Sequence, residues 1–166
     1  MKQRHYAVYV ETVWNGKDYS RACSSVYLCD IDGCNTGQMI TLTMCGGKDE
    51  GQAVMLRKAT LAALNRVLAE MVEAGSEIML YINCGYIRNA LMQKQYQRWQ
   101  QNGWKTEQGT DLPEGSDQWQ KLLALFGTMT VLPIQKGVWE QDIEIAKMLL
   151  QTAELGAMTP EERKNA

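Results

Sequence analysis

Residues 77–82, with the sequence EIMLYI, form a nearly continuous apolar run between two segments that have helical patterning. Such a run is typical of a strand buried on both faces, as in the centre of a sheet or in a parallel strand. The preceding segment 49–75 has apolar residues spaced by three, four and seven positions, which predicts a long helix. Parallel strands need a crossover of this kind, so the chain is expected to fold as a layered α/β domain.

Three strand segments precede this helix: HYAVYVETVW (5–14), RACSSVYLCDI (21–31) and GQMITLTMCG (37–46). They alternate and are rich in β-branched and aromatic residues, and the sequence DGCNTG between the second and the third predicts a turn. Because the connections are short, the three segments are expected to form an antiparallel meander. Asp49 is predicted to cap the helix that follows, with Gln52 at the capping-box position.

The second half of the chain has further helical segments and one more strand segment: helices over 86–101, 117–126 and 139–155, and a strand over 128–135. Pro133 cannot donate a hydrogen bond to a neighbouring strand, so this strand is expected at a sheet edge. The prediction is a five-stranded mixed sheet with helices on both faces. Residues 1–155 should form one domain, and residues 156–166 a frayed C-terminal tail.

The charge balance restricts the possible partners. Seventeen Lys and Arg against 19 Asp and Glu give a net charge of −2, so bulk attraction to a polyanion is not expected. No apolar run approaches the roughly 18 residues of a membrane span. The N-terminus has too short an apolar run for a signal peptide. A soluble, cytoplasmic protein without membrane association is therefore expected.

Several motifs in sequence order together resemble type 1 ribonuclease H over roughly residues 5–150. The segment RWQQNGWKTEQGTDLPEGSDQWQKLLALFG (98–127) is similar to the aromatic and basic handle of that family, its GWKT sequence and the D-x-W-Q-x-L that opens the next helix. NCGYIRNAL (83–91) is similar to the D-S-x-Y-V-x-x-A-I segment, and QKG (135–137) to V-K-G-H. The resemblance implies the ribonuclease H fold, with strand one next to strands two and four and strand five beside strand four.

The resemblance also implies a reaction and its ligands. Ribonucleases H cleave the RNA strand of RNA–DNA hybrids with two magnesium ions, which three Asp and one Glu hold. Here the corresponding positions are Glu11, Leu56, Asn83 and Glu144. Only Glu11 and Glu144 are acidic, and both are one methylene longer than Asp. The family's His before the last helix matches Val138. Mg²⁺ prefers charged oxygen ligands in near-octahedral geometry, so a metal pair is expected to bind weakly or not at all.

The sequence leaves three functional hypotheses open. The first is a catalytically impaired ribonuclease H-like module that binds an RNA–DNA hybrid, another nucleic acid or a protein. The second is an active Mg²⁺- or Mn²⁺-dependent endonuclease with a rearranged site, in which Glu11 and Glu144 hold metal. The third is a partner-binding domain without a nucleic-acid role. The expected nucleic-acid contacts belong to the handle segment, defined here as residues 94–105, and are Lys94, Arg98, Trp99, Trp104 and Lys105.

Overall fold

The computed structural model describes residues 3–17, 20–31, 37–47, 49–134 and 143–165. Five strands form one sheet in the order β3-β2-β1-β4-β5. Their bounds are β1 His5–Asn15, β2 Arg21–Asp30, β3 Gly37–Cys45, β4 Glu77–Ile82 and β5 Thr130–Val131. The meander pairs antiparallel, whereas β1-β4 and β4-β5 pair parallel. The predicted five-stranded mixed sheet is therefore confirmed.

The apolar run 77–82 forms the interior strand β4, between β1 and β5, as expected for a buried parallel strand. Residues 5–10 of β1 pair with all six residues of β4. β5 lies at an edge, also as expected, but it has only two residues and ends before Pro133. The long predicted strand 128–135 is thus wrong in length, and its last residue lies outside the described part of the chain.

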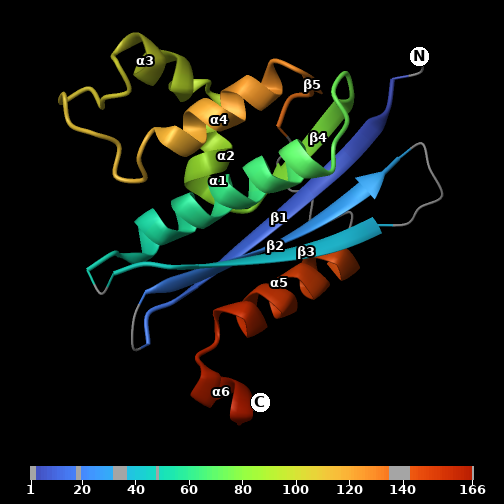
Figure 1. Cartoon of the computed structure of the whole chain (residues 1–166), viewed down its shortest axis with the longest axis vertical. Helices are drawn as coiled ribbons and strands as arrows, with labels where there is room; N and C mark the ends of the chain where they lie inside the picture. The colour runs from blue at the N-terminus through green and yellow to red at the C-terminus, as the bar shows by residue number, and fades with distance from the viewer. Residues whose placement is uncertain (1–2, 18–19, 32–36, 48, 135–142, 166) are drawn as a thin grey trace.

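Helices cover both faces of the sheet (Figure 1). α1 (Gln52–Glu70), α2 (Gly85–Met92), α3 (Gln95–Gln101) and α4 (Asp117–Phe126) lie on one side, and α5 (Ile143–Ala157) lies on the other. The main core fills the first side, where Val8 and Leu80 of the sheet pack with Leu64 of α1 and Trp119 of α4. A smaller cluster lies under α5 and includes Ala7, Tyr9, Tyr81 and Leu149.

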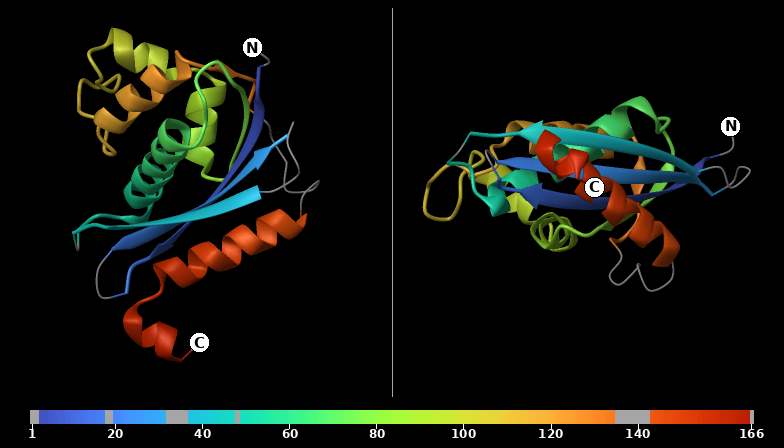
Figure 2. Two further views of the ribbon diagram at one scale, coloured as in Figure 1. Left: turned by 45° about the vertical axis from the view of Figure 1, so that its right-hand side comes forward. Right: turned by 90° about the horizontal axis from the view of Figure 1, so that it is seen from below.

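α5 runs in the same direction as β1. Near its start, Ile145 packs against the cluster that contains Ala7, and at its end the carbonyl of Ala157 accepts a hydrogen bond from Asn15. The two elements therefore proceed together from the start of β1 to its end (Figure 2). This direction decides which carboxylates of α5 can approach the sheet residues further along β1.

Three local predictions need correction. α1 begins after Gly51, without a side-chain cap, so Asp49 and Gln52 do not form the expected capping box. The predicted helix 86–101 is two helices, because Lys94 adopts a left-handed conformation (φ 54°) between them. The C-terminal segment is ordered as α6 (Pro160–Lys164), which has a capping box between Thr159 and Glu162.

Some predictions concern residues outside the described ranges. These are the turn over 32–36 and positions 135–138, which the sequence resemblance matched to V-K-G-H and to the family's His. Among the helices of the described ranges, none has the length and apolar character needed to cross a bilayer.

Candidate functional site

Three of the four predicted ligand positions meet at one place. Glu11 lies on β1, and Asn83 directly follows β4, where its backbone N–H donates to the carbonyl of Val10 over 3.1 Å. Leu56 comes from the first half of α1. All three line a cavity of about 290 Å³. The parallel pairing of β1 and β4 produces this meeting, because it brings the carboxyl end of β4 level with Glu11.

A hydrogen bond joins the two polar residues of this cavity. The Asn83 side-chain nitrogen donates to Oε2 of Glu11 over 2.5 Å. Glu11 is 8% exposed, so the bond satisfies a carboxylate that has little access to water. Asn83, by contrast, is exposed. The amide therefore acts as a neutral donor that bridges the two strands.

Burial raises the pKa of the Glu11 carboxyl above its ordinary value. The hydrogen bond from Asn83 opposes this shift, and the negative charge of Glu154 adds to it. Glu11 therefore holds its proton more strongly than an exposed Glu does. A metal pair would need the opposite, a fully ionised carboxylate surrounded by cations.

Glu144 does not join Glu11, Leu56 and Asn83, contrary to the sequence expectation. It is exposed in the first turn of α5, near the beginning of β1, and it does not line the cavity. Because α5 runs along β1, the α5 carboxylate that influences Glu11 is Glu154, more than two turns later. No local sequence pattern indicates this, because the direction of α5 is set by packing on the sheet.

Arg57 is the charged residue of the cavity that the sequence reasoning missed. Its guanidinium carbon lies 3.6 Å from the centre of the Tyr86 ring, and its Nη1 lies 3.5 Å from Oε1 of Glu114. The other oxygen of Glu114 accepts a hydrogen bond from Nε1 of Trp119 over 3.1 Å. Burial, together with Glu114, raises the pKa of the Tyr86 hydroxyl. Arg57 directly follows Leu56, one of the predicted ligand positions. This adjacency was the sequence signal that could have indicated a place for Arg57 at the cavity.

The residues around this cavity do not suit a pair of magnesium ions. The charged lining residues are one carboxylate, Glu11, and one guanidinium, Arg57. Leu56 offers no donor atom, and the Asn83 amide directs its N–H₂ group toward Glu11. Within the described ranges no group of three or more His, Cys, Asp or Glu residues could hold a metal ion. Two divalent ions close together would lack the negative charge that must offset their repulsion.

The handle segment presents a small polar groove of about 220 Å³, which Arg98, Trp99 and Lys105 help to line. Lys94, Arg98 and Lys105 are exposed. Lys105, however, forms an ion pair with Asp111 over 2.5 Å. Trp99 is half-buried between Tyr86 and Trp119, with ring centres 6.2 and 5.3 Å away. Its main contacts are therefore structural.

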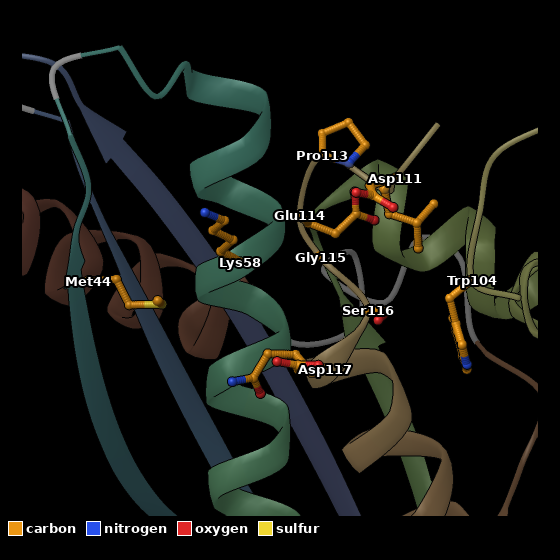
Figure 3. A pocket seen from close by; sticks show the side chains of 11 residues that line it. Met44, Lys58, Trp104, Asp111, Pro113, Glu114, Gly115, Ser116 and Asp117 are labelled. Atoms are coloured by element: carbon orange, nitrogen blue, oxygen red, sulfur yellow. The ribbon is translucent and has the colours of Figure 1, made fainter. Parts of the chain in front are cut away.

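A larger cavity, of about 630 Å³, lies between α1 and the loop that leads into α4 (Figure 3). Trp104 is the only predicted site residue among those that line it. Figure 3 shows Lys58 on the α1 side, and Asp111, Glu114 and Asp117 on the loop side. Because carboxylates outnumber cations here, this cavity is a poor place for a phosphate backbone.

Comparison with known proteins supports the fold. No family model matches the sequence, and no curated protein matches it either. Among solved structures, the RNase H domain of PFV has a TM-score of 0.64 at 12% identity, over 95% of this chain and 96% of that one. LC9-RNase H1, a type 1 RNase H with the type 2 active-site motif, has a TM-score of 0.60 at 13% identity, over 93% and 74%.

The foamy viral protease-reverse transcriptase is similar as well. Its structure in complex with an RNA/DNA hybrid has a TM-score of 0.60 at 11% identity, over 93% of this chain and 20% of that one. At such low identities the similarity concerns the fold.

Proposed function

We propose, starting from the ribonuclease H-like fold of this chain, that it is a nucleic-acid-binding module that does not carry out two-metal cleavage. The observation that carries the proposal is the hydrogen bond from Asn83 to Glu11. In the resembled family both positions are Asp and both hold metal. Here the two side chains satisfy one another, so the tip of β4 is joined to β1 without an ion.

Nucleic acid would bind along the handle segment, with Lys94 and Arg98 as the main phosphate contacts. In the described part of the chain neither side chain forms an ion pair, whereas Lys105 is engaged with Asp111. Two of the solved neighbours were determined with dsDNA or with an RNA/DNA hybrid, which makes duplexes the first ligands to test. A few phosphate contacts imply weak binding that depends on salt.

The first test measures binding and cleavage on one labelled RNA–DNA hybrid. We expect binding with a salt slope of about −2 to −3 in log K against log salt concentration, since two to three cations each contribute about −0.9. Arg98→Ala should reduce that slope by about one. Lys147→Ala is the matched control, because Lys147 is exposed on α5, across the sheet. No cleavage is expected with Mg²⁺ or Mn²⁺.

Two outcomes would decide against the proposal. Metal-dependent cleavage by the native chain that Glu11→Gln abolishes would establish the rearranged endonuclease instead. Absence of binding to hybrid, duplex and single strands would favour the partner-binding domain.

A paired variant tests the site itself. Leu56→Glu with Asn83→Asp adds two carboxylates beside Glu11, so Mg²⁺ affinity measured by calorimetry should rise above that of the native chain. An unchanged affinity in a folded variant would mean that charge at these positions is not what limits metal binding.

A further inference from the structure

β3 is the outermost strand of the sheet, and it offers one open edge. Its inner edge pairs with β2 over residues 37–45. In the described ranges, no strand pairs with its outer edge (Figure 2). Such an edge carries alternating N–H and C=O groups that can pair with another strand.

The two edges of this sheet differ in how they are protected. β5 has two residues and is followed shortly by Pro133, so it offers little backbone for pairing. β3 is nine residues long, with the sequence GQMITLTMC, and contains neither a charged residue nor a proline. Charges and proline are the usual means by which edge strands avoid pairing with other chains. Their absence leaves β3 competent for strand addition.

An uncharged side of α5 borders this edge. The Thr152 hydroxyl contacts Sδ of Met39 on β3 over 3.5 Å. Met148 lies one turn before Thr152 and Leu155 nearly one turn after it, so both lie on the same side of α5. Their exposures are 40% and 52%, which is high for large apolar side chains. The open edge and an exposed apolar stripe are thus neighbours.

We propose that a second copy of this chain occupies the β3 edge, with the two β3 strands antiparallel about a two-fold axis at Thr41. Thr41 is the midpoint of β3, so this register pairs all nine residues. It places Thr41 opposite Thr41, and Ile40 opposite Leu42 of the second copy, which are favourable cross-strand pairs. In such a symmetric pair a charged residue at the centre would face its own copy, and β3 carries none.

The proposed dimer joins the two five-stranded sheets into one. Because the axis is perpendicular to the sheet, the two α5 helices lie on the same face and turn their Met148 and Leu155 sides toward each other. The apolar stripe therefore continues the strand interface rather than remaining exposed. The handle segment of each copy lies on the face of the sheet opposite α5 (Figure 1).

The experiment is sedimentation equilibrium of the full chain over a concentration series. We expect a monomer–dimer equilibrium, and Thr41→Lys should raise the dimer dissociation constant at least ~10-fold because two lysines then face each other. Thr130→Lys is the matched control, because Thr130 is also exposed and lies on the opposite edge strand. The dimer dissociation constant of this variant should equal that of the native chain. Circular dichroism verifies that both variants fold.

The register has its own test. Thr41→Cys should form an intermolecular disulfide under mild oxidation, whereas native Cys45, exposed on β3, would face Gly37 of the second copy and should not. A monomer at every concentration would overturn the proposal and leave the edge to a strand of another protein. A dimer that Thr41→Lys does not weaken would overturn it as well. Neither result depends on nucleic-acid binding.

Discussion

At the scale of single residues, one amide changes the chemistry of the site. Asn83 satisfies Glu11 without a cation, and burial keeps the pKa of Glu11 raised. The structure brings Glu11, Leu56 and Asn83 together, as the sequence resemblance led us to expect, because each lies in or directly beside a strongly patterned strand or helix. It did not locate Arg57 or Glu154, whose positions depend on tertiary packing. The predicted place of Glu144 was wrong for the same reason.

Glu11→Gln should increase the free energy of unfolding at pH 7. A carboxyl whose pKa is raised by folding favours the folded state when protonated, and this advantage is lost as the pH rises above the ordinary value of 4.5. Gln cannot ionise, yet its carbonyl can still accept from Asn83. The gain should therefore shrink when urea unfolding is repeated at pH 4.

The control for this series is Glu144→Gln, which should change the unfolding free energy by less than ~0.5 kcal/mol because the residue is exposed. A Glu11→Gln variant that is less stable than the native chain at pH 7 would contradict the assigned environment of Glu11.

At the scale of helices and strands, long periodic segments were predictable and their ends were not. Hydrophobic periodicity identified β1 to β4 and the bodies of α1, α4 and α5. The left-handed Lys94 has no signature, since lysine gives no reason to adopt a positive φ. α6 did have one: Thr159, Pro160 and Glu162 fit a capping box with proline in the first turn. The expectation of a frayed tail was therefore wrong, although the sequence contained a recognisable helix-start motif.

The cap of α6 yields a prediction about Glu162. Hydrogen bonds from the Thr159 backbone and from Asn15 lower the pKa of this carboxyl to about 2. The stability that it contributes is present above the ordinary value of 4.5 and is lost as the pH falls toward about 2. NMR titration of the side-chain carboxyl should therefore show a midpoint near 2.

Thr159→Ala should move that midpoint upward and weaken α6 by about 1 kcal/mol, the usual effect of losing such a cap. Thr128→Ala serves as the comparison. The Thr128 hydroxyl donates to the carbonyl of Leu125 at the end of α4, remote from α6. A native midpoint near 4.5 would show that the cap does not form in solution.

At the scale of the whole molecule, Glu114 connects helices on one side of the sheet to one another. Its side chain is 0% exposed, and it contacts Arg57 of α1 and Trp119 of α4. Arg57 in turn lies over Tyr86 of α2. The helices on this side of the sheet thus share one buried charge pair. The sequence did not reveal it, because Glu114 occurs in a polar loop among other acidic residues.

Glu114→Gln should destabilise the fold by about 3 kcal/mol in urea unfolding, the lower end for a broken buried pair, since Arg57 remains 22% exposed. The Gln carbonyl can still accept from Trp119, so the variant isolates the loss of charge. Glu70→Gln is the matched control. It breaks the exposed pair with Arg66 and should cost less than ~0.5 kcal/mol. Equal losses in the two variants would refute the buried role.

The hydrogen bond between Arg21 and Met158 joins two parts of the sequence that are far apart, so it forms only after both have been synthesised. The Arg21 guanidinium donates to the Met158 carbonyl over 2.6 Å, although 137 residues separate them. At about 5 to 20 residues per second, a ribosome needs roughly 7 to 27 s to make that stretch. During this interval β1 and β2 have been synthesised, whereas one acceptor of the buried Arg21 has not. This end of the sheet therefore cannot close until the chain has been made through Met158.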